Sequence, residues 1–215
     1  MPLILHGYHY SVYLRIARIV LAEKGIAYTR REVNPFAADM PEDYLQIHPF
    51  GRVPTLAHDD FVLYETGAIT RYIDEAFPGP PLQPSAPRHR ARMAQIMSIV
   101  DSYGYVPMVR HVFAHRVFAP RAGRTPDEAL IRAGIDAAHR VLGALEALAA
   151  PESGLVDGMA WSLADCHLAP MIAYFTAAPE GAEALTRYPK LSAWWERARR
   201  RDSLRATDPG LPDET

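Results

Sequence analysis

The chain has few of the features that mark secreted, membrane or nucleic-acid-binding proteins. A single cysteine cannot form an internal disulfide, and it fits a reducing compartment. No apolar run reaches the roughly 18 residues of a membrane span, and the N-terminal residues lack the basic head and long apolar stretch of a signal peptide. A net charge of -2 gives no electrostatic attraction for nucleic acid. We therefore expect a cytoplasmic protein with no nucleic-acid or membrane partner.

A proline-rich stretch separates two parts of different character. Five prolines occur within residues 78–87, where they cannot propagate helix or sheet, and they predict a linker over residues 79–87. Residues 1–78 show strand and helix patterns in the order βαβ then ββα, which predicts an α/β domain. Residues 88–215 show long helical periodicity, which predicts an all-α domain.

The predicted elements follow from local signals. In the first part we expect strands at 3–7 and 28–33, helices at 15–24 and 67–77, a short helix after Pro41, and a hairpin at 53–57 and 61–64. In the second part we expect helices at 88–118, bent near Pro107, at 126–149 and from 188 onward. Ser162 and Asp165 form a Ser-x-x-Asp capping box that should start a buried helix over 166–176.

Two short motifs predict a binding site for a small peptide. In the first, Val53 precedes Pro54 at a strand start, and because proline supplies no N–H to a ladder, the backbone of Val53 should face a groove; a cis bond is compatible with this position. In the second, Glu65-Thr66 falls where a strand meets a helix, and free N–H groups, a hydroxyl and a carboxylate suit the α-amino and α-carboxylate groups of an amino acid.

Three segments resemble the glutathione-binding domain of cytosolic glutathione transferases: residues 11–26, 48–56 and 63–73, in that order and spacing. The capping box and residues 188–195 resemble the C-terminal part of the same family. The resemblance implies a thioredoxin-like domain followed by an all-helical domain, glutathione as cosubstrate, and a homodimer. It implies transfer of the glutathione thiolate to a small hydrophobic electrophile. Isomerase, dehalogenase, ether-cleaving or peroxidase activity, and a non-catalytic binding module, stay open as alternatives.

Ser11 is the predicted thiolate stabiliser. A free thiol has a pKa of about 8.5, so the site must favour the thiolate by hydrogen bonding or by a helix N-terminus. Ser11 lies where the first strand ends and the first helix begins, so it supplies both a hydroxyl donor and a helix N-terminus. At this position the chain resembles the serine-type transferases. The chain lacks the proline that often follows this serine. Tyr8 and Tyr10 therefore remain alternative donors, and Ser11 remains a candidate for a plain N-cap.

The resemblance also implies roles for the residues around the tripeptide. Val53, before Pro54, would pair with the cysteinyl residue, and Glu65 and Thr66 would hold the γ-glutamyl end. Many serine-type members place a basic residue where this chain has Ala38 and Asp39. Arg52 is therefore the predicted partner of the glycine carboxylate, through a bidentate guanidinium contact. His48 is a weaker candidate for the same role.

Further candidates lie in the helical part. Asp101 would either reach across a dimer interface to the γ-glutamyl amine or form an intrachain ion pair. His111 and His115 are spaced like metal ligands, but no third ligand accompanies them, so we expect no metal. Cys166 should be a small core residue. The electrophile pocket would be lined by Tyr8, Tyr10, Tyr105, Met108, His111, Val112 and His115, although the same spacing is also typical of core packing.

Overall fold

The computed structural model describes residues 2–37, 40–150 and 154–211. The chain divides into two compact units. The α/β unit contains the chain up to Pro81 together with Ala206–Pro209, and the helical unit contains Leu82–Arg205. The predicted fold class is confirmed: a thioredoxin-like α/β unit is followed by an all-helical unit. The return of residues 206–209 to the first unit differs from the predicted organisation, in which they belonged to the second.

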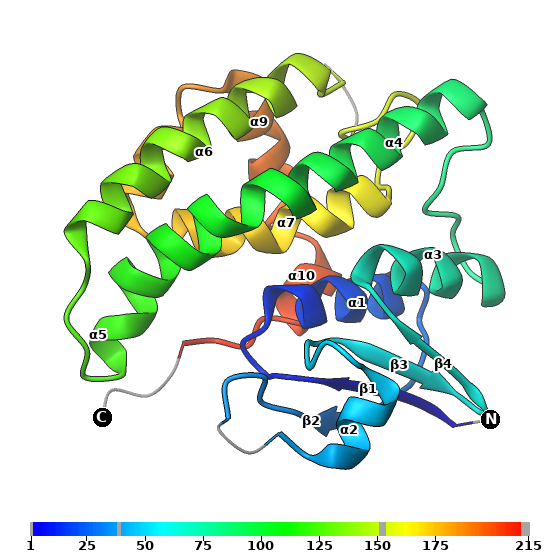
Figure 1. Ribbon diagram of the computed structural model, residues 1–215. Coiled ribbons are helices and arrows are strands. Elements are labelled where there is room, and N and C mark those ends of the chain that lie inside the picture. Colours follow the sequence, from blue (N-terminus) through cyan, green and yellow to red (C-terminus); the bar gives the residue numbers. More distant parts are fainter. Residues whose placement is uncertain (1, 38–39, 151–153, 212–215) are drawn as a thin grey trace. The chain divides into compact units, whose positions relative to one another are not determined.

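The α/β unit holds a four-stranded mixed sheet in the order β2-β1-β3-β4. β1 pairs in parallel with β2 and antiparallel with β3, and β3 pairs antiparallel with β4. Helices α1 and α3 lie side by side against one face of the sheet, as Figure 1 shows. The elements are β1 Leu3–Gly7, α1 Val12–Glu23, β2 Thr29–Glu32, α2 Glu42–Ile47, β3 Thr55–His58, β4 Phe61–Tyr64 and α3 Thr66–Ala76.

The strand register brings three separate loops to one edge of the sheet. His6, near the end of β1, lies opposite Thr55, the first residue of β3. Thr55 in turn lies opposite Tyr64, the last residue of β4. The residues that follow β1, precede β3 and follow β4 therefore emerge at the same edge. These three segments carry the predicted catalytic and peptide-binding residues.

The helical unit differs from the prediction along its first long helix. The predicted single helix with one bend is α-helical only in its first part, and it continues as two π-helical segments before a final α-helical turn. Pro107 lies in the second π segment and has no N–H to donate to an α-helical ladder. The elements are α4 Pro87–Ile99, η1 Val100–Gly104, η2 Val106–Phe118, α5 Ala119–Arg121, α6 Glu128–Leu148, α7 Leu163–Thr176, α8 Pro179–Leu185, α9 Pro189–Ala198 and α10 Asp202–Ala206.

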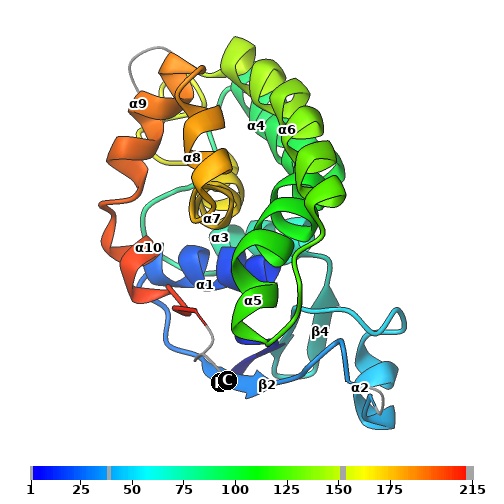
Figure 2. The same ribbon diagram turned by 90° about the vertical axis from the view of Figure 1, so that its left-hand side faces the viewer.

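Helix α7 lies at the centre of the helical unit, between the α4–η2 helix and the α8–α9 region (Figure 2). The predicted capping box is present at its start, between Ser162 and Asp165. The Asp165 carboxylate is fully buried and accepts hydrogen bonds from Ser162 N and Oγ, from Leu155 N at 3.1 Å and from Trp194 Nε1 at 2.7 Å. One carboxylate thus joins the start of α7 both to α9 and to the loop that precedes α7. Cys166 is buried beside it, as predicted.

Replacing Asp165 with alanine should destabilise the helical unit by about 3–5 kcal/mol, because several buried donors would lose their acceptor. The three tryptophans of the chain all lie in this unit. Urea unfolding followed by tryptophan fluorescence therefore measures the change directly. The control is Asp136→Ala, at an exposed position of α6, which should shift stability by no more than about 0.5 kcal/mol. Equal effects of the two substitutions would contradict the role of Asp165.

Candidate functional site

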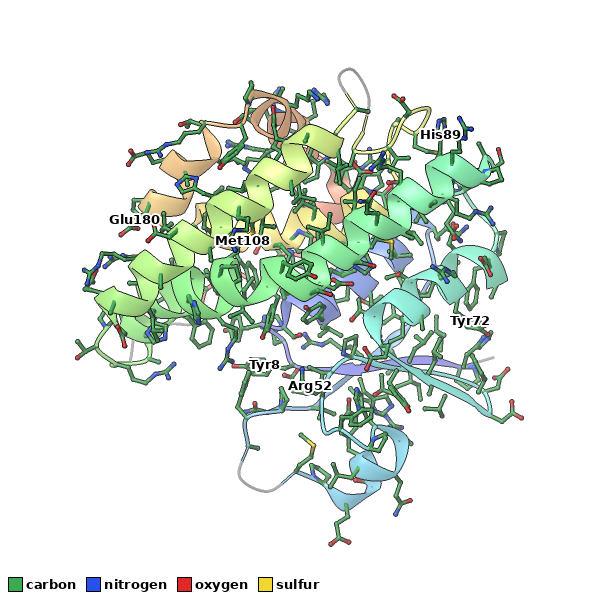
Figure 3. All side chains as sticks on the ribbon, turned by 45° about the horizontal axis from the view of Figure 1, so that its top comes forward. Tyr8, Arg52, Tyr72, His89, Met108 and Glu180 are labelled. Carbon is green, nitrogen blue, oxygen red and sulfur yellow. The ribbon has the colours of Figure 1, made fainter. Side chains whose placement is uncertain are left out.

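The shared edge of the sheet carries a surface hollow of about 460 Å³. Phe50, Arg52 and Glu65 line it. Two of these residues, Arg52 and Glu65, were predicted to bind opposite ends of a peptide, and their charges are opposite as such a ligand requires. Tyr8 and Arg52, labelled in Figure 3, mark this edge on the β1 and β3 sides.

Ser11 caps the first helix and is placed to donate a hydrogen bond. It precedes α1 with an extended backbone, and its Oγ accepts the N–H of Leu14 at 3.3 Å. Because the hydroxyl oxygen is the acceptor in that contact, the hydroxyl proton remains available for a ligand atom. The positive end of the α1 dipole lies at the same point. The N-cap role left open by the sequence is confirmed, and it is compatible with stabilising a thiolate.

Tyr8 and Tyr10 form an aromatic cluster beside Ser11. The Tyr8 ring contacts the rings of Tyr10 at 5.7 Å and Phe36 at 5.9 Å, both edge-on. Burial raises the pKa of the Tyr8 hydroxyl, and the neighbouring Tyr10 and Glu32 raise it further. Tyr8 is therefore neutral at physiological pH and able to donate a proton in a hydrogen bond. Its role as an alternative thiolate donor stays a prediction.

The turn before β3 is held by a buried tyrosine. The β1–β3 ladder begins at Thr55, so Val53 lies outside it, and the Val53–Pro54 peptide bond is cis. The Tyr44 hydroxyl donates to the Arg52 carbonyl at 2.6 Å and lies 3.0 Å from the Thr55 hydroxyl. Helix α2 thereby holds the Arg52 carbonyl before Val53 and the Thr55 side chain after it. Among the described residues, no protein group pairs with the N–H or C=O of Val53.

Glu65 has a positive φ, a backbone conformation that residues other than glycine rarely adopt. It precedes α3 with φ 71° and ψ 116°. Strain of this kind persists where the surrounding structure requires it, often at binding sites. The Glu65 side chain is exposed and lines the hollow, while the adjacent Thr66 is buried and opens the helix. The first N–H groups of α3 have no intrahelical acceptors and add positive potential at this point.

His48 is a buried ring next to the hollow. Only 2% of its surface is exposed, its ring lies 4.8 Å from that of Tyr64, and its Nδ1 has no hydrogen-bond partner among the described residues. Burial lowers the pKa of His48; Glu65 opposes this effect and Arg52 adds to it. The imidazole is therefore neutral near pH 7, which makes it a poor electrostatic partner for a glycine carboxylate.

Two candidates in the helical unit have hydrogen-bond partners within that unit. Asp101 Oδ1 accepts a hydrogen bond from Nδ1 of the fully buried His167 at 3.2 Å. This is the intrachain partner that the sequence left open, and a role for Asp101 across an interface stays a prediction. The His115 Nδ1 accepts the backbone N–H of Asp127 at 3.3 Å. Ala38 and Asp39 lie outside the described residues.

The predicted electrophile-pocket residues fall into two groups. Tyr10, Tyr105, His111 and His115 are partly exposed, whereas Met108 and Val112 are fully buried. Val112 packs where η2 approaches α6 so closely that a Cβ on Gly134 would lie 2.9 Å from it. The two buried residues thus fill the core of the helical unit, and the composition of the pocket remains a prediction.

The residues that the structure describes contain neither a metal-ligand cluster nor a membrane-spanning helix. No group of three or more His, Cys, Asp or Glu side chains in this part of the chain is arranged to hold a metal ion. Within the same ranges, none of the helices is long and apolar enough to cross a membrane.

Comparison with known proteins identifies the family. Residues 5–81 match the family model for the glutathione S-transferase N-terminal domain, and residues 128–197 match that for the C-terminal domain. The chain belongs to the glutathione S-transferase family. This membership confirms the resemblance predicted from the three N-terminal segments.

Relatives of this glutathione S-transferase family member include proteins named glutathione S-transferase and proteins named stringent starvation protein A homolog. Glutathione S-transferase F13 of Arabidopsis thaliana is 28% identical, over 98% of this chain and 97% of its own length. The stringent starvation protein A homolog of Haemophilus ducreyi is 30% identical, over 75% of this chain and 69% of its own. The solved apo structure of glutathione S-transferase III has a TM-score of 0.84, with 29% identity, covering 99% of this chain and 98% of the other.

The sequence did not indicate the roles of two residues that shape the site. Phe50 lines the hollow with 68% of its surface exposed, although nothing in its sequence context within residues 48–56 indicates that position. The tertiary contact of Tyr44 with the turn before β3 also had no local signal. A tyrosine in a short amphipathic helix is ordinarily assigned to the core, and only the fold shows which groups its hydroxyl contacts.

The buried His48 should make stability fall at acidic pH. Its pKa in the folded state is lowered below the ordinary value of 6.5, so the unfolded chain takes up the proton first. The contribution of His48 to stability is therefore present above pH 6.5 and is lost as pH falls through the lowered pKa. In His48→Asn, which removes this titration, the free energy of unfolding should decline less between neutral and mildly acidic pH. A decline as steep as in the native chain, measured by urea unfolding at each pH, would contradict this assignment.

Proposed function

We propose that the chain is a glutathione S-transferase that joins the glutathione thiolate to a small hydrophobic electrophile, acting as a cytoplasmic homodimer. The observation that carries the proposal is the convergence of Ser11, Val53 and Glu65 on one edge of the sheet. The register of β1, β3 and β4 produces this convergence, and each residue offers a different kind of contact. Together they match the chemistry of the γ-glutamyl group, the cysteinyl backbone and the thiol of glutathione.

The tripeptide would be held along this edge by charge at its ends and by backbone in its middle. Glu65 attracts the γ-glutamyl ammonium, and Thr66 with the first N–H groups of α3 attracts the adjoining carboxylate. The unpaired backbone of Val53 bonds the cysteinyl residue as a short strand addition. Arg52, exposed at the hollow, binds the glycine carboxylate.

Placed in this way, the cysteinyl sulfur would lie toward the N-terminus of α1. The Ser11 hydroxyl donates its proton to the sulfur in a hydrogen bond, and the α1 dipole adds a favourable potential. Both effects favour the thiolate over the thiol and lower the thiol pKa. The thiolate then forms the new bond to the electrophilic carbon. In a substitution the leaving group departs with its bonding electron pair; in an addition to a double bond the π electron pair moves away from that carbon, and the anion so formed takes a proton from solvent.

An apolar substrate suits the aromatic surface beside Ser11. Tyr8 and Tyr10 are partly exposed, and Phe36 exposes 64% of its surface. These rings all come from the α/β unit: Tyr8 and Tyr10 precede Ser11 in the sequence, and the Phe36 ring contacts that of Tyr8. They support an electrophile with an aromatic or aliphatic body.

A non-catalytic binding module is the second candidate. The relative named stringent starvation protein A homolog, at 30% identity, favours it because its name is not that of a transferase. Ser11 discriminates between the two functions, since a module that only binds partners does not require a stabilised thiolate.

Replacing Ser11 with alanine should lower turnover by a factor on the order of 10² while glutathione affinity changes little, because the hydroxyl acts mainly on the thiolate. Steady-state kinetics with an electrophile that absorbs light on conjugation measures turnover, and calorimetry measures affinity. The control is Ser98→Ala, at an exposed position of α4. Unchanged turnover in Ser11→Ala would move the donor role to Tyr8 or Tyr10, tested by phenylalanine at each.

Replacing Glu65 with glutamine should instead weaken glutathione binding by about 10- to 100-fold, the usual value of a charge-assisted hydrogen bond. Glutamine keeps the size of the side chain and removes the charge that attracts the ammonium group. Calorimetric titration measures the dissociation constant, with the exposed Glu42→Gln in α2 as the matched control. Native affinity in the Glu65 variant would rule out its assigned role.

A further inference from the structure

Residues 207–209, here called the C-terminal segment, lie against the start of α1 within the α/β unit. Three contacts hold this segment. Arg18 Nη1 donates to the Thr207 carbonyl at 3.2 Å. Arg15 Nη2 lies 3.4 Å from the Asp208 carboxylate, and His9 Nε2 lies 3.1 Å from the Pro209 carbonyl. The segment is drawn in red beside α1 in Figure 1.

The residues that hold the segment flank Ser11 on both sides. Ser11, Arg15 and Arg18 are spaced at i, i+4 and i+7, so they share one face of α1 and its cap. His9 belongs to the turn before the helix, which the Ser11 N–H closes by donating to the Tyr8 carbonyl at 2.8 Å. The Arg15 N–H donates to the Ser11 carbonyl at 3.0 Å. The segment therefore bridges the turn before Ser11 and the helix after it.

The contact with Arg15 involves a buried charge. Only 3% of the Arg15 side chain is exposed, whereas 58% of the Asp208 side chain is exposed. A guanidinium in such an environment is stable only with compensating partners. Asp208 supplies a negative charge from the solvent side, and it thereby anchors the segment to the first turn of α1.

The contact with His9 has a defined direction. Arg30 Nη1 lies 2.6 Å from His9 Nδ1, and because a guanidinium can only donate, Nδ1 is the acceptor. The ring proton is then on Nε2, which donates to the Pro209 carbonyl. The backbone N–H of His9 donates to Glu32 Oε1 at 2.8 Å. The turn that precedes Ser11 is thus fixed to β2 on one side and to the C-terminal segment on the other.

We propose that Asp208 is a positioning residue for Ser11: through Arg15 and the C-terminal segment, it holds the cap of α1 in the geometry that stabilises the glutathione thiolate. This inference rests on the proposed function. A hydrogen bond to sulfur weakens steeply with distance and angle, so a looser turn lowers the thiolate population without removing any group that binds the tripeptide. Asp208 lies far along the chain from the residues that bind glutathione in the proposal.

The test compares Asp208→Asn with Asp202→Asn, whose carboxylate pairs with Arg205 at an exposed position of α10. The first measurement is hydrogen exchange of the amides in residues 8–14, without glutathione. The second is the pH dependence of turnover, together with the thiolate absorbance of bound glutathione. We expect faster exchange in Asp208→Asn and a thiol pKa raised toward the free value. Turnover at neutral pH should fall by roughly 3- to 10-fold and recover at higher pH, with glutathione affinity changed by less than about 2-fold.

A second variant, His9→Phe, keeps a ring against Tyr10 and removes the donor to Pro209, and it should shift the same quantities in the same direction. Amide exchange in both variants as slow as in the native chain would show that the segment does not hold the turn. Faster exchange with an unchanged pH dependence of turnover would show that the segment only packs against the turn, and it would overturn the positioning role. A lowered thiol pKa in Asp208→Asn would also overturn it, because Asp208 would then act through its charge. If the native chain binds no glutathione, the proposed function fails and this role falls with it, a result separate from every exchange outcome.

Discussion

The pairing of Thr55 with both His6 and Tyr64 is the constraint on which the α/β unit depends. The two pairs align the end of β1, the start of β3 and the end of β4. A shift by one residue in either ladder would turn every side chain of the shifted strand to the opposite face of the sheet. It would also separate the loops that carry Ser11, Val53 and Glu65. The site therefore follows from the ladder, and its loops need little structure of their own beyond caps and one supporting tyrosine.

The helical unit is organised around a different kind of interaction, a buried carboxylate. Asp165 satisfies donors from the start of α7, from the loop before it and from α9. A buried polar group with several fixed partners rejects alternative packings, because any displacement leaves donors unpaired in the interior. Elsewhere in this unit a glycine permits close helix contact, as Gly134 does between α6 and η2.

Much of this could be predicted from the sequence, for physical reasons that differ between elements. The strands, the helix caps and the capping box were predictable because their signals are local: alternating apolar residues, a serine before an apolar helix, a Ser-x-x-Asp spacing. The motif at Val53 and Glu65 was predictable because proline and a strand–helix junction have fixed backbone consequences. The π-helical geometry of residues 100–118, the short helices α8 and α10, and the contact of Tyr44 were not, because tertiary packing decides them. The full burial of Met108 shows the same limit, since spacing alone does not separate a pocket wall from a core.

The α/β unit is discontinuous in the chain, since Ala206–Pro209 complete it after the whole of Leu82–Arg205. A ribosome synthesises the chain from its N-terminus and releases segments in that order. The sheet and its helices are thus available early, but the residues that contact Arg15 and Arg18 emerge only after every residue of α4 through α9. Assembly of the first unit ends with residues that are made after Leu82–Arg205, which couples its completion to the synthesis of the second.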